Sequence, residues 1–262
     1  MDNAFGTQLR TWRDRRHMSQ LELGLTANVS ARHISFLETG RAKPSRPMVM
    51  MLGDVLGVPR ASRNALLNAA GFAPAYQRRD WSDEDMASVR DAVDWTMKRH
   101  DPYPAFALDR HWRLIKTNRS ASAMLGSLNI GEGDSLLDLM TNIEMTKALF
   151  ENWHEVMRHM LTRLRTESLY LGGDEVLNAA AEKLASALGT QASTPMGTLA
   201  AMIPAHYRAG DATLSLFSTI AQFGTAEDIA LADMKIEMLF PADDESRTML
   251  LTMFGSGHET AG

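Results

Sequence analysis

Residues 19–45 read SQLELGLTANVSARHISFLETGRAKPS, and this stretch decides the fold of the first part of the chain. It holds two short helical patterns on either side of a break at ANVS. Ser19 and Ser30 are suited to cap these helices, because a serine hydroxyl accepts a hydrogen bond from a first-turn amide. Asn28 tolerates the left-handed backbone of a tight turn, and Gly40 suits a helix end. The stretch therefore predicts two short helices joined by a tight turn.

The helix expected over residues 30–39 has two chemically different faces. At about 100° per residue, Ile34 and Leu37 fall together, while Arg32 and Phe36 lie opposite. An exposed phenylalanine beside an arginine is unusual on a plain solvated face. The pair suits a helix in a DNA major groove, where arginine bonds to guanine and an apolar ring touches a thymine methyl group. We therefore expect this helix to contact bases.

Charge divides the chain into two parts. The 262 residues have a net charge of −5, but residues 1–79 hold 12 Lys and Arg against 5 Asp and Glu, which leaves 15 against 27 for residues 80–262. This asymmetry indicates two domains with different partners, of which the basic one is a candidate for binding phosphate backbones. The absence of cysteine excludes disulfides and thiolate metal sites. Without a membrane-length apolar run or a signal-peptide pattern, we expect a cytoplasmic protein and no membrane partner.

Roughly the first 70 residues resemble the helix-turn-helix of the lambda-repressor/Cro-like (XRE) regulators. The residues that carry the resemblance are Gln20, Gly24, Val29, Ser30, Ile34, Leu37, Glu38 and Gly40, followed by RAKPS and PMVMMLGDVLGV. It implies an all-α headpiece of five helices, with residues 30–39 as the recognition helix and a small residue at Gly24 where two helices cross. It also implies an internal ion pair between Arg13 and Glu38. Asn28 stands where the family usually has glycine.

The same resemblance implies which residues meet DNA. Arg32 and Phe36 would face bases, and Gln20 would contact a phosphate or the recognition helix. Phosphates would mostly be contacted by Ser30, Ser35, Arg41 and Lys43. The expected DNA-contacting residues are Gln20, Ser30, Arg32, Ser35, Phe36, Arg41 and Lys43. The implied partner is a double-stranded DNA operator, and we expect a homodimer because one headpiece reads few bases.

The acidic remainder predicts an α+β domain. Strand-like segments are AFALD, RLIKTN, MIPAHYR, TLSLFSTIAQF and KIEMLF, and helices are expected at about 119–126, 144–168 and 174–189. Ser82 is expected to cap a further helix that begins with acidic residues. We place the domain division between residues 76 and 77, which gives a helix-turn-helix domain over 1–76 and a ligand-binding and dimerisation domain over 77–262.

A second resemblance covers most of the chain. PYPAFALDRHWRLIKTNRSASAMLG at 102–126 has the order strand, turn, strand and short helix capped by Asn118, and it resembles the opening of a PAS-like sensor fold. Together with the helix-turn-helix, AAGFAPAY at 69–76 and the segment at 218–247, it is similar to regulators of the MmyB-like ligand-binding family. The resemblance implies a single-component transcription regulator whose C-terminal domain senses a small, apolar or fatty-acyl-like molecule.

Several residues of this domain are candidates for binding the ligand. Eighteen methionines and five tryptophans suit an irregular apolar pocket, but ordinary core is the alternative and the better explanation for any single methionine. The candidates are Trp112, Trp153, Met157, Met160, His206, Arg208 and Phe217. His206 and Arg208 share a strand face suited to a carboxylate head, which an exposed sheet face explains as well. The alternative function is a C-terminal domain that makes protein contacts only, without an effector.

No motif indicates catalysis, and neither a cofactor nor a metal is expected. HEVMRH places His154 and His159 five residues apart, whereas the zinc motif needs a spacing of four to bring both onto one helix face. The nucleophile pattern GxSxG is absent, and no glycine-rich loop has the length or the following lysine of a phosphate-binding loop. We expect a regulator and not an enzyme.

Overall fold

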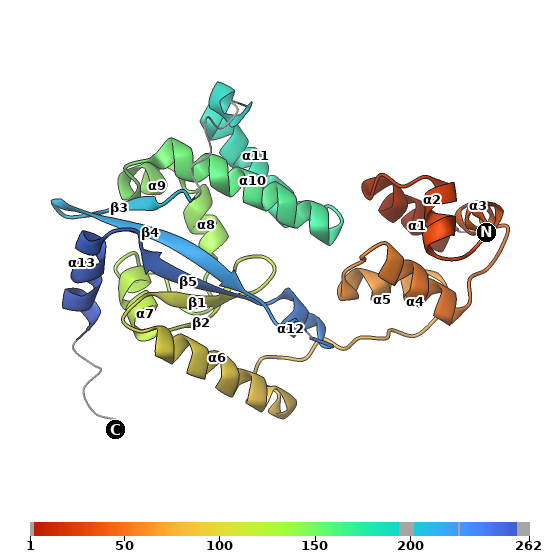
Figure 1. Ribbon diagram of the computed structural model, residues 1–262, viewed down its shortest axis with the longest axis horizontal. Coiled ribbons are helices and arrows are strands. Elements are labelled where there is room, and N and C mark those ends of the chain that lie inside the picture. Colours follow the sequence, from red (N-terminus) through yellow and green to blue (C-terminus); the bar gives the residue numbers. More distant parts are fainter. Residues whose placement is uncertain (1–2, 194–201, 225, 256–262) are drawn as a thin grey trace. The chain divides into compact units, whose positions relative to one another are not determined.

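The computed structural model describes residues 3–193, 202–224 and 226–255, which form two compact units (Figure 1). The first unit comprises the residues up to Arg78 with Thr166–Glu175 and Ala226–Ile229, and the second comprises the rest. The N-terminal part of the first unit is all-α and is called the headpiece below. The second unit contains a five-stranded sheet. This architecture confirms the predicted α+β class, in which five helices precede the sheet in the sequence.

The headpiece helices are α1 (Ala4–Arg15), α2 (Gln20–Thr26), α3 (Ala31–Glu38), α4 (Arg46–Val55) and α5 (Arg60–Ala69). The Ser19 hydroxyl accepts from the Glu22 amide at 3.1 Å, and the Glu22 carboxylate accepts from the Ser19 amide at 2.6 Å, so α2 begins with a capping box. Asn28 has a φ of 54° and Gly40 a φ of 73°. These local features confirm the expected turn between α2 and α3 and the expected end of α3.

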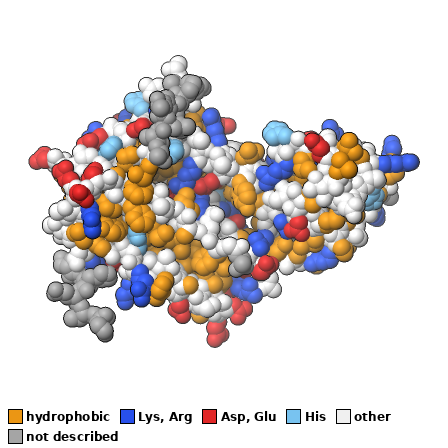
Figure 2. Space-filling view, viewed as in Figure 1, with side chains coloured by type: hydrophobic (Ala, Val, Ile, Leu, Met, Phe, Trp, Pro, Cys, Tyr) orange, Lys and Arg blue, Asp and Glu red, His pale blue; other side chains and the backbone are white. Residues whose placement is uncertain are grey.

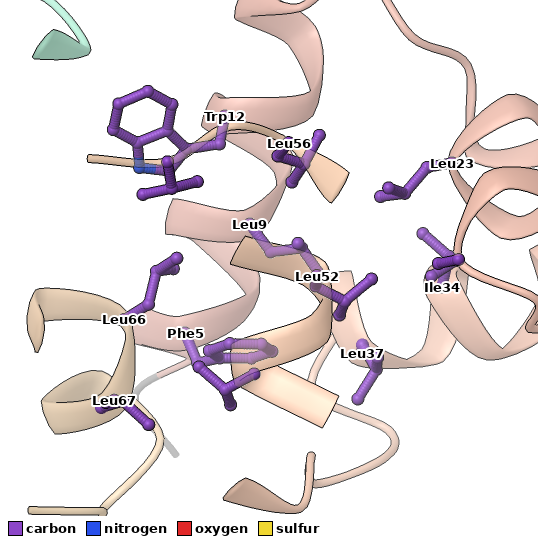
Figure 3. Packing of buried hydrophobic residues seen from close by; sticks show 13 residues of the cluster. Phe5, Leu9, Trp12, Leu23, Ile34, Leu37, Leu52, Leu56, Leu66 and Leu67 are labelled. Carbon is purple, nitrogen blue, oxygen red and sulfur yellow. The ribbon is translucent and has the colours of Figure 1, made fainter. Parts of the chain in front are cut away.

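The headpiece core draws leucines from all five helices (Figure 3). Leu9 of α1, Leu23 of α2 and Leu37 of α3 are fully buried. Close crossing of α2 on the start of α3 depends on Gly24, since a Cβ atom there would lie 2.7 Å from the Val29 carbonyl oxygen. The small residue expected at this crossing is therefore required by the packing.

The second unit is built on an antiparallel sheet with the strand order β2-β1-β5-β4-β3. The strands are β1 (Ala105–Leu108), β2 (Leu114–Thr117), β3 (Ala205–Ala209), β4 (Ala212–Ala221) and β5 (Lys235–Pro241). Each lies within or close to a segment that the sequence predicts as a strand. One face of the sheet packs against α6 (Ala87–His100), where Val93 and Met97 contact Ala105, Ala107 and Ile236. The opposite face carries the side chains that alternate with these along each strand.

Besides the strands and α6, the elements after the headpiece are the short helix η1 (Glu84–Met86), α7 (Arg119–Gly126), α8 (Leu136–Thr141), α9 (Ile143–Leu149), α10 (Trp153–Leu171), α11 (Glu175–Leu188), η2 (Gly189–Ser193), α12 (Ile229–Asp233) and α13 (Asp244–Phe254). The expected helix over 119–126 is confirmed as α7, capped by Asn118. The expected cap at Ser82 is wrong: its amide and hydroxyl bind the Asp80 carboxylate, and the chain starts η1 two residues later. No helix of the described residues is both long and apolar enough to cross a bilayer.

The single helix predicted over residues 144–168 is also wrong, because the chain divides it into α9 and α10. Phe150 is extended and forms a bridge with Tyr207 of β3. The Glu151 amide donates to the His206 carbonyl at 2.9 Å, and the Asn152 side chain accepts from the His206 amide at 3.0 Å. The edge of the sheet thus takes the Glu151 amide, which a continuous helix would hydrogen-bond within itself, and helix periodicity alone does not reveal this.

Candidate DNA-contact surface and ligand cavity

The outer face of α3 presents two guanidinium groups over one aromatic ring. Arg32 Cζ lies 5.2 Å and Arg41 Cζ 5.9 Å from the centre of the Phe36 ring. Both arginines are exposed and Phe36 is half-buried, whereas Ile34 and Leu37 point into the core. Such cation–π contacts hold arginines in a defined orientation. The face therefore offers donors and an apolar ring together, as base contact requires.

A buried carboxylate holds α3 to the helices before it. Glu38 accepts from Arg13 Nε at 2.6 Å and from Arg13 Nη2 at 3.1 Å, and Gln20 Nε2 donates to it at 2.8 Å. Arg13 Nη1 also donates to the Met18 carbonyl at 2.7 Å. The hydrogen bond with Glu38 raises the pKa of Arg13 above its ordinary value. Arg13 is thus structural, as expected, and the Gln20 side chain contacts α3.

The remaining DNA candidates lie on the same small surface. The Ser30 hydroxyl accepts from the His33 amide at 3.1 Å and caps α3, while Ser35 is half-buried on that helix. Lys43 is exposed in the turn after α3. The headpiece surface shows more Lys and Arg, in blue, than Asp and Glu, in red (Figure 2). The candidates therefore lie on α3, at its two ends and, for Gln20, on the helix that contacts Glu38.

The second unit encloses a cavity of about 920 Å³. Alternate residues of β3, namely Ala205, Tyr207 and Ala209, line it together with their cross-strand partners Leu216, Leu214 and Ala212 in β4. Phe106 of β1 and its partner Glu237 of β5 belong to the same face. Residues of α7, α8, α10 and α13 complete the wall. The volume and the apolar lining are those of a small-molecule site.

Four of the seven ligand candidates line this cavity and three do not. Trp112, Met160, Arg208 and Phe217 are in its wall. Trp153 is buried elsewhere, with its ring nitrogen donating to the Thr146 hydroxyl at 2.9 Å. Met157 is fully buried core. His206 Nδ1 lies 2.8 Å from the Ser215 hydroxyl. Of the two residues expected to bind a carboxylate head together, Arg208 lines the cavity and His206 does not.

Arg208 has a specific partner in the fold. Its Nη1 donates to the carbonyls of Lys147, Ala148 and Phe150 at 3.0, 3.2 and 2.9 Å. A cation at the end of a helix satisfies carbonyls that have no intrahelical partner. Arg208 thus stabilises the end of α9 while its side chain borders the cavity.

A buried ion pair crosses the cavity wall. Arg163 of α10 donates from Nη1 and Nη2 to the two oxygens of Glu237 at 3.0 and 2.9 Å. The Arg163 guanidinium lies 4.2 Å from the Trp112 ring centre, and Lys235 Nζ lies 5.1 Å from the same ring. Sequence reasoning missed Arg163, Tyr207 and Glu237. Helical spacing from Met160 to Arg163 and alternation from Ala205 to Tyr207 were the available signals.

The histidines of HEVMRH do not form a metal site. His154 and His159 are exposed on α10, and His159 reaches the wall of the cavity. Among the described residues, no group of three or more His, Asp or Glu side chains is placed to hold a metal ion.

Two protein families match the chain. Residues 89–252 match the ligand-binding domain of MmyB-like transcription regulators, and residues 4–66 match a helix-turn-helix domain. These matches coincide with the unit that contains the cavity and with the headpiece. No curated protein matches the chain significantly.

Proposed function

The chain belongs to the MmyB-like transcription regulators, and on that premise we propose how it binds DNA and what it senses. It is a DNA-binding transcription regulator with a ligand-binding domain and not an enzyme. We propose that it binds an inverted-repeat operator as a homodimer in the cytoplasm. We also propose that an apolar, fatty-acyl-like molecule occupies the PAS-like C-terminal domain and controls operator affinity.

The arrangement around Phe36 supports the proposed mode of DNA binding. Arg32 and Arg41 approach one ring from the exposed side of α3, and the Glu38 network fixes the helix from the buried side. A single headpiece contacts few base pairs, and a two-fold dimer doubles that number. Light scattering with and without operator DNA measures the stoichiometry, and a monomer on DNA contradicts the proposed dimer.

The cavity is the observation that carries the proposed ligand class. Its lining comes mainly from Leu, Met, Ala and Phe side chains, which favour an apolar chain over a polar metabolite. This supports an effector-binding domain over the alternative of a domain that makes protein contacts only.

A co-purification experiment tests the ligand. Protein purified in the native state is denatured, and released small molecules are identified by mass spectrometry. Ala205→Phe fills the cavity from β3 and is expected to abolish the released species. Thr219→Phe, on an exposed position of β4 that does not line the cavity, is the matched control and is expected to retain it. Release of a strongly polar metabolite would contradict the proposed class.

If the ligand controls DNA binding, the affinity for the operator must differ between the ligand-free and the ligand-bound protein. Operator affinity is therefore measured with the chain freed of ligand and again with saturating ligand. Equal affinities would refute this mechanism while leaving both binding sites intact.

A further inference from the structure

The outer face of α6 is exposed and has a tryptophan at its centre. Val93 and Met97 of this helix pack on the sheet, and at about 100° per residue Trp95 lies opposite both of them. The Trp95 side chain is 61% exposed, whereas three of the other four tryptophans are buried and the fourth is half-buried. Tryptophan is a residue type that commonly anchors the centre of a protein interface. The face therefore presents an anchor without a partner in its own unit.

Two opposite charges flank Trp95 on this face. Asp91 lies one helical turn before it and Arg99 one turn after it, and both are exposed. Arg99 Cζ lies 4.5 Å from the centre of the Trp95 ring, so the guanidinium is held along the face while its N–H groups can still donate. Among the described residues, neither Asp91 nor Arg99 forms an ion pair. The order along the helix is therefore negative, aromatic, positive.

This order makes the face complementary to itself. If two copies of α6 pack antiparallel about a two-fold axis at Trp95, the two tryptophans meet and Asp91 of each copy faces Arg99 of the other. A parallel arrangement would place like charges opposite each other. Ser88 and Ala92 on the same face are small and exposed, so the two helices can approach closely beside the tryptophans.

We infer that the outer face of α6 binds the same face of a second copy of this chain, with Trp95 at the two-fold axis. This inference rests on the proposed homodimer and names its contact surface. Trp95 supplies most of the affinity, and the charges of Asp91 and Arg99 set the antiparallel direction, since exposed ion pairs contribute little by themselves. One helix face supplies only part of the roughly 800 Å² per partner of a standard interface, so we expect a reversible dimer.

Substitution of the tryptophan tests the anchor. Sedimentation velocity of the full-length protein over a concentration series measures the dissociation constant of the dimer. Trp95→Ala is expected to raise this constant at least about thirtyfold, as loss of a central interface tryptophan does. Leu251→Ala is the matched control, because it removes an exposed apolar side chain from α13 of the same unit, and it is expected to leave the constant unchanged.

Charge reversal tests the antiparallel direction. Asp91→Arg and Arg99→Asp each place like charges opposite each other twice, so each variant alone is expected to dimerise about tenfold more weakly or worse. In an equimolar mixture, both pairs across the axis have opposite charges again. The mixture is therefore expected to form a heterodimer within about threefold of the wild-type affinity. Thermal unfolding checks that each variant is folded, and the charge-reversal mixture decides if Trp95→Ala is unstable.

The outcomes separate this inference from the proposed homodimer. If the wild type is a dimer and Trp95→Ala dimerises equally well, or if the mixture does not recover, the assignment to α6 is refuted while the homodimer stands. If the wild type dimerises only on operator DNA, the variants are compared on that complex with the same criteria. If the wild type is a monomer both free and on operator DNA, the homodimer and the inference fail together.

Discussion

Glu38 at the end of α3 accepts two hydrogen bonds from the Arg13 guanidinium, and both side chains are buried. Gln20 donates to the same carboxylate. Three helices of the headpiece therefore meet at one charged group, and the orientation of the proposed DNA-contact surface depends on it.

Glu38→Ala is expected to destabilise the protein strongly. Removal of one partner from a buried ion pair leaves the other charge uncompensated, which costs about 3–5 kcal/mol in the free energy of unfolding. Arg10→Ala is the control, because Arg10 is exposed and lies 3.6 Å from Asp14, and its loss costs less than about 0.5 kcal/mol. Urea denaturation measures the free energy of unfolding of both variants. A similarly small decrease in both would show that the Glu38 network is dispensable.

Arg32→Ala is expected to reduce specific binding more than non-specific binding. Loss of one base-reading arginine costs about 1–3 kcal/mol of operator affinity and relaxes the preference at one base position. Lys43→Ala is the comparison, because a lost phosphate contact weakens binding to all sequences and reduces the salt dependence. Binding to a library of operator variants measures the difference. Uniform weakening by Arg32→Ala would assign Arg32 to the phosphates.

Stability is expected to depend on pH through His100. Burial lowers the pKa of His100 below its ordinary value of 6.5, and its Nε2 lies 2.8 Å from the Leu239 carbonyl. The unfolded chain therefore binds the proton more readily, so the contribution of His100 is complete above about pH 6.5 and decreases as pH falls through the lower folded value. The melting temperature of the wild type should fall more between pH 7 and 5 than that of His100→Gln. An equal fall in melting temperature for the wild type and His100→Gln would contradict this role of His100.

Gly24→Ala is expected to disturb the headpiece despite its small size. The added methyl group would lie 2.7 Å from the Val29 carbonyl oxygen, so α2 and α3 would have to separate. Overpacking of this kind costs about 1–3 kcal/mol. Gly126→Ala in α7 meets no atom within 4 Å and should be neutral or stabilising. Thermal unfolding compares the two, and equal stability of both variants would show that the crossing tolerates a side chain.

The headpiece was largely predictable because its signals are local. Ser19, Ser30, Asn28 and Gly40 each determine a cap or a turn within a few residues, and the buried face of α3 follows from helical spacing. Of the DNA candidates, Arg32 and Phe36 follow from the same spacing, whereas the others follow from the resemblance to helix-turn-helix regulators.

The cavity was harder to predict because its wall is assembled from distant segments. Arg163 and Glu237 are separated by 74 positions, and only the pairing of strands and the placement of α10 bring them together. Trp153 and Met157 are of residue types that suit an apolar pocket, but both are buried in the core. The division between α9 and α10 was missed for the same reason, because its cause is the distant strand β3.

The residues between α9 and α10 have a consequence for solubility. β3 is the last strand of the sheet, and an uncovered last strand is a template on which another chain can add and aggregate. Glu151 and Asn152 occupy the amide and carbonyl of His206, and Asn152 also donates to the Pro204 carbonyl at 2.9 Å. The segment between α9 and α10 thereby protects the β3 edge of the sheet from the addition of a strand from another molecule.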